Sequence, residues 1–253
     1  MLTSLVVLAL GIIGGTPSGD DAVVCLSADG LPLCTGVVIG PRTVLTAGHC
    51  INPLGPNVAY VVNVGADCTK PTAHAKVELM LAHPSYSGEG RPFDVGLIKL
   101  STALAVTPMT LRDAALEAST VGATLRHVGF GTNQEQPMQG RGVRRTVSHA
   151  VLRLDADFVW SGDASANTCL GDSGGPALLD EQVIAVVSDG PDCHSESADQ
   201  RLDVARTWLD ETRSSFEPAV TPMEKRGCST GGSGALVLLV LTTFRRPRRT
   251  HRR

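Results

Sequence analysis

Aromatic residues are scarce in this chain, and the shortage limits the kind of core that it can build. Phe, Trp and Tyr together make up 4% of the 253 residues, whereas there are 27 glycines and 15 prolines. This balance argues against a helical bundle and favours a turn-rich β protein with small side chains inside. A chain of this length can bury one large core or two modest ones.

Basic charge is also sparse over most of the sequence. Six of the 22 basic residues lie in the last nine positions, which hold no acid, so the first 244 residues carry 16 basic and 25 acidic side chains. An acidic body binds nucleic acid poorly, so nucleic acid is not an expected partner.

The N-terminal apolar run is short and carries no charge. It extends from Leu2 to Leu10 and ends in Ala9-Leu10-Gly11, the small-x-small pattern that signal peptidase reads. The basic residues that usually begin such a signal are missing, so either the true start lies upstream or the signal is minimal. A buried first strand is the alternative. We expect residues 1–11 to be a signal peptide, and with seven cysteines this predicts export and disulfides.

The segment Gly171–Pro176, with sequence Gly-Asp-Ser-Gly-Gly-Pro, is the most informative part of the chain. Its glycines suit a tight turn in which Ser173 is exposed and consecutive backbone N–H groups converge. Such a turn can present a nucleophile beside an anion hole when a base lies nearby. His49, in Leu45–Cys50, is the candidate base. Asp94, in Phe93–Leu97, is the candidate acid that orients it.

These three segments, preceded by Ile12-Ile13-Gly14-Gly15, resemble the motifs of trypsin-like (chymotrypsin-fold, S1-type) serine endopeptidases in their order. The resemblance covers residues 12–209. It implies an all-β fold of two six-stranded antiparallel β-barrels with a C-terminal helix. We expect the N-terminal barrel in residues 12–106, the C-terminal barrel and closing helix in residues 107–213, and a linker in residues 214–230.

The resemblance also implies roles for individual residues. His49, Asp94 and Ser173 would be catalytic, and the N–H groups of Gly171 and Ser173 would form the oxyanion hole. A cut before Ile12 would free an α-amino group that pairs with Asp172. No Arg or Lys precedes Ile12, so we expect signal removal itself, and not a trypsin-like cut, to produce this end.

The expected specificity pocket departs from the trypsin pattern. Asn167 stands at its base, where an acid would be needed to favour Arg or Lys, and Ser188 and Gly190 line it. Asp189 replaces a usual tryptophan, and together with Asp192 it could place charge nearer the rim. We therefore expect a neutral polar or medium apolar residue before the scissile bond.

Four of the cysteines match disulfide pairs of the family, namely Cys34 with Cys50 and Cys169 with Cys193. The sequence leaves open whether Cys25 and Cys68 also pair. Calcium in the loop after Gly65 is not expected, because the nearby acids are too few. No metal and no cofactor are expected.

Two other segments have competing interpretations. Gly129-Phe130-Gly131 resembles the strand that opens the second barrel of the family, and a dinucleotide loop fails because no helix pattern or third spaced glycine follows. The helical spacing in Leu202–Leu209 predicts the closing helix, with Trp208 as a packing residue.

The tail, residues 231–253, joins an apolar stretch to an arginine cluster. From Gly231 to Phe244 there are 14 residues, about 21 Å of helix, which is short of a roughly 30 Å hydrocarbon core. With Gly227-Cys228 before it, the tail resembles bacterial C-terminal sorting signals of the Myxo or Gly-Gly type. We expect the helix to be removed and Cys228 to be a possible lipidation site; an anchor left in place is the alternative.

The function predicted from the sequence is a secreted or surface-attached serine endopeptidase that acts on protein or peptide substrates. We expect it to be a monomer that meets a membrane only through its tail, and a protein inhibitor is a possible partner. A catalytically silent protease-fold binding module at the cell surface is the rival prediction, motivated by the unusual pocket. An esterase with the same triad is a third.

Overall fold

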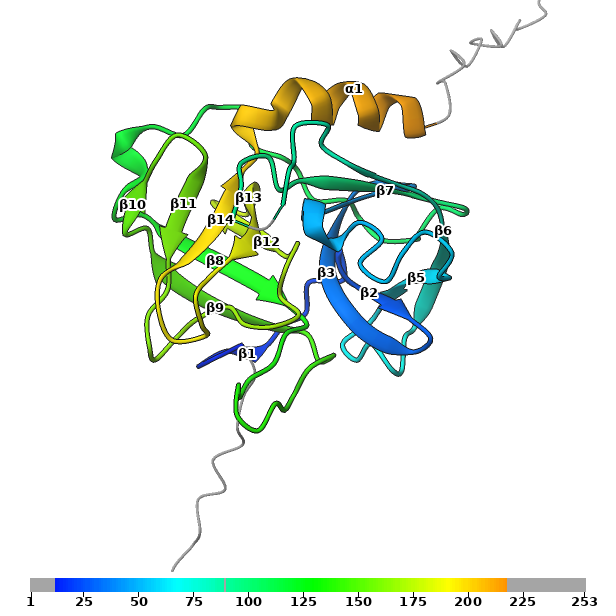
Figure 1. Ribbon diagram of the computed structural model, residues 1–253, viewed down its shortest axis with the longest axis horizontal. Coiled ribbons are helices and arrows are strands. Elements are labelled where there is room, and N and C mark those ends of the chain that lie inside the picture. The colour runs from blue at the N-terminus through cyan, green and yellow to red at the C-terminus, as the bar shows by residue number, and fades with distance from the viewer. Residues whose placement is uncertain (1–11, 89, 218–253) are drawn as a thin grey trace, which may run out of the picture. The chain divides into compact units, whose positions relative to one another are not determined.

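A computed structural model of the chain describes residues 12–88 and 90–217, and they form two β structures side by side with a helix across one end (Figure 1). The signal peptide, most of the linker, Cys228 and the sorting tail predicted from the sequence lie outside the described residues. In the described part, no helix has both the length and the apolar character needed to cross a membrane.

The first half is a closed six-stranded barrel, as predicted. Its order is β2-β3-β4-β7-β6-β5, and neighbouring strands are antiparallel. The strands are β2 (Val23–Ala28), β3 (Leu31–Gly40), β4 (Thr43–Thr46), β5 (Tyr60–Val64), β6 (Ala73–Ala82) and β7 (Gly96–Leu100). Small aliphatic side chains fill its interior, in keeping with the low aromatic content.

The second half differs in detail from the predicted six-stranded barrel. It is an eight-stranded sheet rolled into a half-barrel, with the order β1-β9-β8-β12-β13-β14-β11-β10. Its strands are β1 (Thr16–Pro17), β8 (Thr124–Gly129), β9 (Arg145–Ala150), β10 (Arg153–Leu154), β11 (Phe158–Ser161), β12 (Pro176–Leu179), β13 (Gln182–Asp189) and β14 (Ser197–Arg201). The two extra strands are two-residue additions at its edges. One of them, β1, comes from the N-terminal segment.

A shared apolar core joins the two halves. It combines Val37 and Leu45 of the first barrel with Val128 and Val186 of the second sheet, all almost completely buried. Because these apolar side chains are buried by contacts with both halves, their packing stabilises the halves in a single relative position. Residues of both halves can therefore contribute to one functional site at their junction.

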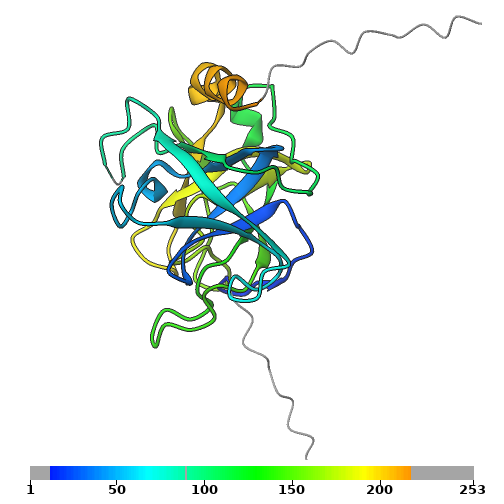
Figure 2. The same ribbon diagram turned by 90° about the vertical axis from the view of Figure 1, so that its right-hand side faces the viewer.

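The C-terminal helix α1 (Arg206–Phe216) packs against this core and runs from the second half to the first (Figures 1 and 2). It follows a short 3-10 helix at Asp203–Ala205, and a second such helix, Ala118–Thr120, lies in the connection between the halves. Helix α1 buries Leu209 and Phe216, and Trp208 packs against the same cluster. Beyond its end, the Glu217 carboxylate accepts hydrogen bonds from Thr43 and Arg42 of the first barrel.

Candidate active site

Two neighbouring strands of the first barrel bring His49 and Asp94 together. Strand β4 ends at Thr46 and β7 begins at Gly96, and these two residues pair across the antiparallel ladder. His49 follows β4 in the 3-10 helix Gly48–Cys50, and Asp94 comes two residues before β7. Continuing the ladder beyond the strand ends therefore places the acid next to the imidazole.

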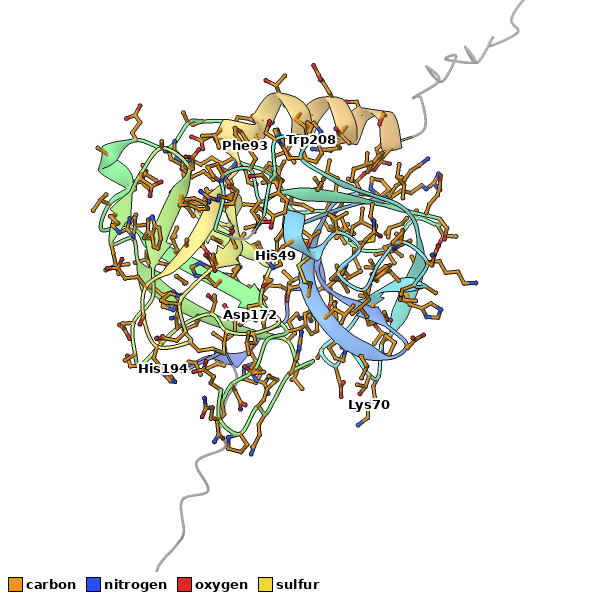
Figure 3. All side chains as sticks on the ribbon, viewed as in Figure 1. His49, Lys70, Phe93, Asp172, His194 and Trp208 are labelled. Atoms are coloured by element: carbon orange, nitrogen blue, oxygen red, sulfur yellow. A yellow bond between two sulfur atoms is a disulfide. The ribbon has the colours of Figure 1, made fainter. Side chains whose placement is uncertain are left out.

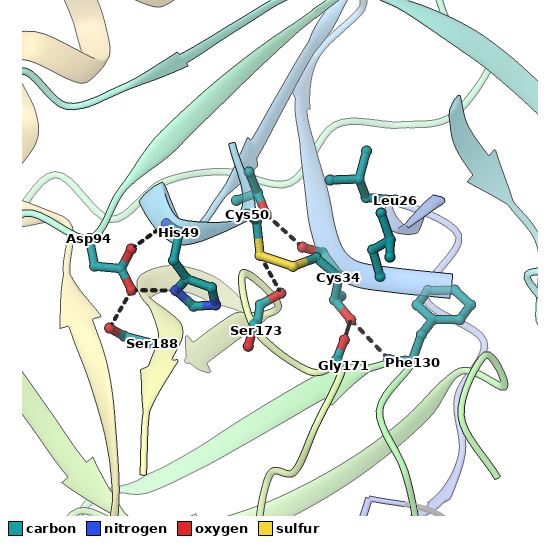
Figure 4. Close-up of a disulfide and its surroundings, with 12 residues drawn as sticks. Leu26, Cys34, His49, Cys50, Asp94, Phe130, Gly171, Ser173 and Ser188 are labelled. Atoms are coloured by element: carbon teal, nitrogen blue, oxygen red, sulfur yellow. Dashed lines mark hydrogen bonds and ion pairs between the residues drawn. A yellow bond between two sulfur atoms is a disulfide. The ribbon is translucent and has the colours of Figure 1, made fainter. Parts of the chain in front are cut away.

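The Asp94 carboxylate holds His49 by two contacts. Its Oδ2 lies 2.8 Å from His49 Nδ1, and its Oδ1 accepts the backbone N–H of His49 at 2.8 Å. Ser188, at the end of β13 in the second half, donates its hydroxyl to Asp94 Oδ2 at 2.6 Å. Asp94 is 1% exposed, so these bonds are shielded from water. The imidazole is thereby fixed with its ring directed toward Ser173 (Figure 4).

Phe93, just before Asp94, has a strained backbone. Its φ is 65°, a left-handed value that is unusual for a bulky residue. Its ring stacks on His83 at 4.6 Å, and His83 meets the Trp208 ring edge at 5.0 Å. This aromatic group under α1 (Figure 3) holds the turn that delivers Asp94, and it gives His83 and Trp208 packing roles.

Ser173 lies in a loop that both halves hold. The backbone N–H of Thr35, in β3, donates to the Ser173 carbonyl at 2.9 Å, and the Thr35 hydroxyl donates to the Gly171 carbonyl at 2.8 Å. Gly171 has a φ of 102°, and a Cβ there would lie 2.9 Å from Arg141 Nε. A side chain at this position would therefore clash and strain the turn. Across residues 12–88 and 90–217, the N–H groups of Gly171 and Ser173 have no protein acceptor.

Asp172 points away from Ser173, into the interior of the second half. Its two carboxylate oxygens accept the N–H groups of Gly131 at 2.7 Å and Cys169 at 2.8 Å. Burial raises the pKa of Asp172 to about 6, although these two hydrogen bonds oppose the change. A Cβ on Gly129 or Gly131 would lie within 2.3 Å of this carboxylate, so the Gly-Phe-Gly sequence leaves room for the acid.

The N-terminal segment reaches the same region. Ile12 is 1% exposed, and the carbonyl of Ile13 accepts the N–H of Asn167 at 3.0 Å. The Ile12 nitrogen belongs to a peptide bond with Gly11 in the full chain, so it can pair with Asp172 as a cation only after a cut.

A cavity of about 280 Å³ opens beside Ser173 and His49, and it includes two of the three predicted pocket residues. Ser188 and Gly190 line it. Asn167 does not: it is fully buried, its amide group donates to the Ser195 carbonyl, and its oxygen accepts the Ser197 hydroxyl at 3.0 Å. Asn167 therefore adjoins two residues that line the cavity, Thr168 and Ser197, without lining it itself.

Thr168 and Ser197 line the cavity in place of Asn167, and their hydroxyls are 3.2 Å apart. Three carboxylates, those of Glu135, Asp189 and Asp192, also line it. Sequence reasoning raised the two aspartates but missed Glu135 and Ser197. Neither lies in a recognisable motif, and Ser197 is brought to the cavity by the pairing of β14 with β11.

Three disulfides fix the loops around the site. The structure pairs Cys34 with Cys50 and Cys169 with Cys193, the pairs that the resemblance implies, and it also pairs Cys25 with Cys68. Among the described residues, side chains able to bind a metal come together at Cys34, Cys50 and His49. Both of these sulfur atoms are in the disulfide, so they are not available as thiolate ligands.

A buried polar pair that the sequence did not indicate lies behind the cavity. His127 Nε2 is 2.8 Å from Asp199 Oδ2, and both side chains are completely buried. Asp199 pairs across the sheet with Val187, which lines the cavity. The His149 ring lies 5.0 Å from that of His127, and burial, together with the His127 charge, lowers the pKa of His149 to about 3. His149 is therefore neutral in the folded protein at neutral pH.

A closed barrel and a half-barrel, with His, Asp and Ser meeting at their junction, define the class of the trypsin-like serine proteases. Residues 12–209 match the Trypsin family, so the chain belongs to that family. It is 29% identical over 210 residues to Serine protease 28 of Mus musculus, covering 70% of this chain and 76% of that protein. It is also 28% identical to a trypsin of Simulium vittatum (63% and 71% covered) and 26% identical to a trypsin of Saccharopolyspora erythraea (68% and 81% covered).

Proposed function

We propose that this chain is a serine endopeptidase that hydrolyses peptide bonds with His49, Asp94 and Ser173. The observation that carries the proposal is the 2.8 Å contact between His49 Nδ1 and a buried Asp94, with the imidazole directed toward Ser173. A carboxylate on Nδ1 keeps the proton there, so that Nε2 is the nitrogen that acts as the base. Family membership supports the same reaction class.

In the proposed mechanism, Ser173 Oγ attacks the scissile carbonyl carbon while His49 Nε2 takes the hydroxyl proton. The carbonyl π electrons move to oxygen, and the N–H groups of Gly171 and Ser173 stabilise that negative charge. Each such donor contributes about 3 kcal/mol. The imidazolium, stabilised by Asp94, then protonates the leaving amine as the C–N bond breaks. Water repeats the steps on the acyl-enzyme and restores the Ser173 hydroxyl.

Activation by a cut before Ile12 is part of the proposal. The buried position of Ile12 and the raised pKa of Asp172 support it, because a buried carboxylate without a counter-charge is costly. A new α-amino group there would supply that charge and order the loop that carries Ser173. N-terminal sequencing of the mature protein tests this step, and a start other than Ile12 or Ile13 contradicts it.

For the side chain before the scissile bond we propose a neutral polar or a medium-sized apolar residue. The hydroxyls of Thr168 and Ser197 line the cavity, and the amide of Asn167 is already hydrogen-bonded beneath them. The three carboxylates that line the cavity are at exposed or half-exposed positions, so a guanidinium entering the space beside Thr168 and Ser197 would lose water without meeting a buried counter-charge. Cleavage of a mixed peptide library checks the preference, and dominance of Lys or Arg would contradict it.

We also propose that the protein is exported. The three disulfides support an oxidising compartment. Processing of the tail with modification of Cys228 is proposed from the sequence alone. Mass spectrometry of the mature C-terminus tests it, since an intact Arg253 excludes removal of the tail.

The decisive experiment is covalent labelling of the mature protein with a fluorophosphonate probe. The proposal expects labelling of Ser173 in the wild type and none in Ser173→Ala, together with hydrolysis of peptides by the wild type only. A binding module on a protease fold would leave Ser173 unlabelled. An esterase would be labelled and would hydrolyse esters but not peptides.

A further inference from the structure

A single arginine lies across the loop that holds Ser173. Arg141 is exposed, its Nη2 donates to the carbonyl of Leu33, and its Nε lies 2.9 Å from where a Cβ on Gly171 would be. Desolvation lowers the pKa of Arg141 and the charge of Asp172 opposes this change, while the Asp172 oxygens already accept the N–H groups of Gly131 and Cys169. Only one of its five N–H donors has an acceptor among the described residues, so the guanidinium retains donors for a ligand.

Arg141 lies on the leaving-group side of Ser173. Ser188, which lines the cavity for the side chain before the bond, is on one side of Ser173, and the Cys34–Cys50 disulfide is on the other (Figure 4). Leu33, which accepts from Arg141, directly precedes Cys34. A peptide that places its acyl part in the cavity must therefore pass its next residues toward the guanidinium.

The loop that carries Arg141 is held rigidly. Arg145 donates from Nη1 to the carbonyls of Gly140 at 2.7 Å and Val143 at 2.8 Å, on either side of Arg141. Gly142 donates its N–H to Phe130 and accepts the N–H of Cys68, both at 2.7 Å. A charged group on a fixed loop loses little conformational entropy when it binds a ligand.

The charge around Ser173 is divided between its two sides. Glu135, Asp189 and Asp192 line the cavity on the acyl side, whereas Arg141 stands on the other. An acidic residue is repelled from the first side and attracted to the second. A guanidinium with free donors matches a carboxylate in shape as well as in charge.

We propose that Arg141 is a specificity-determining residue that selects peptides with a carboxylate on the first or second residue after the scissile bond. This inference rests on the proposed peptidase function. Because the pair would be partly exposed, its effect is modest: about three- to fivefold in kcat/KM for Asp over Asn at the preferred position.

The test uses the mature protein and peptides that differ only in having Asp, Asn or Lys at the first or second residue after the bond. The wild type should cleave the Asp peptide about three- to fivefold faster than the Asn peptide and should cleave the Lys peptide slowest. Arg141→Gln should cleave Asp and Asn peptides equally, Arg141→Lys should keep part of the preference, and Arg141→Glu should prefer Lys. Arg112→Gln, which removes an arginine elsewhere on the surface, should retain the wild-type order.

Two results overturn the inference. One is a wild type with no preference among the three peptides. The other is an Arg141→Gln variant that loses the same fraction of kcat/KM on every peptide, because Arg141 then acts only by supporting the Gly171 loop. Hydrolysis of a peptidyl methyl ester, which has no residue after the reacting bond, reports the proposed function separately. If the wild type neither reacts with the fluorophosphonate nor hydrolyses the ester, the proposed function and this inference both fail; if it does both without a preference, only the inference fails.

Discussion

Replacing Asp172 with asparagine should stabilise the uncut chain at neutral pH much more than at pH 4. Burial raises the pKa of this carboxyl from 3.8 to about 6. Between these values the folded chain holds a proton that the unfolded chain has released, so the free energy of unfolding falls as pH rises through this window. At about 1.4 kcal/mol per pH unit, the cost above pH 6 is about 3 kcal/mol, and the neutral amide does not incur it.

The substitution also removes one hydrogen bond, since an amide cannot accept the N–H groups of both Gly131 and Cys169 through oxygen. At pH 4 the protonated Asp172 has also exchanged one acceptor for a donor, so this loss of about 1 kcal/mol applies mainly to the ionised form. It reduces the stabilisation expected at pH 7 but leaves its sign unchanged. Comparing the variant with the wild type also cancels the contributions of the other titrating groups.

The assay is denaturant unfolding with disulfides intact, followed by circular dichroism at pH 4 and pH 7. Both proteins keep residues 1–11 and carry Ser173→Ala, so that neither can process itself. Asp113→Asn, at an exposed acid, is the matched control and should show no such pH dependence. An Asp172→Asn effect of equal size at both pH values would refute the reasoning. In a protein that begins at Ile12 and retains Ser173, Asp172→Asn should instead lower activity, because the new α-amino group loses its partner.

The remaining predictions concern the triad, a disulfide and the buried histidine. Asp94→Asn should lower kcat by about 10⁴-fold while binding of a peptide inhibitor is retained, because the imidazole is held in the wrong tautomer; an unchanged kcat would refute the role of Asp94. Replacing both Cys25 and Cys68 with alanine opens a link across 43 residues and should cost about 4 kcal/mol in the free energy of unfolding, measured in urea, with little change in ester hydrolysis. His149→Phe should make the protein less sensitive to acid. The pKa of His149 is about 3 in the folded protein and 6.5 in the unfolded chain, so the wild type loses stability as pH falls between these values. Equal losses of stability in both proteins between pH 7 and pH 4 would contradict the prediction.

The catalytic candidates were accessible from the sequence because each lies in a short segment with its own chemical logic. Ser173 is surrounded by glycines, and Asp94 begins an apolar strand. Their meeting could not be derived from spacing, since His49 and Asp94 are 45 positions apart. It depends on the pairing of β4 with β7.

The pocket shows what the sequence could not specify. Asn167 was expected at its base, and in the structure its side chain is hydrogen-bonded to Ser195 and Ser197 and is completely buried. These hydrogen bonds of the Asn167 side chain depend on the register of β14 against β11 and on the loop closed by the Cys169–Cys193 disulfide. A small shift in either would change which side chain meets the substrate, and neither is encoded in a local pattern.

The sequence alone determined the all-β class, the helix after the second half, and the residues with the chemistry of a nucleophile, a base and an acid. Composition and short motifs specify these features because turn residues, apolar periodicity and reactive groups act locally. Tertiary structure decided which groups touch: Ser188 with Asp94 across the two halves, His127 with Asp199 behind the cavity, and Arg141 against the Gly171 loop. Each of these contacts joins residues distant in the chain, and only strand register and the shared core bring them within bonding distance.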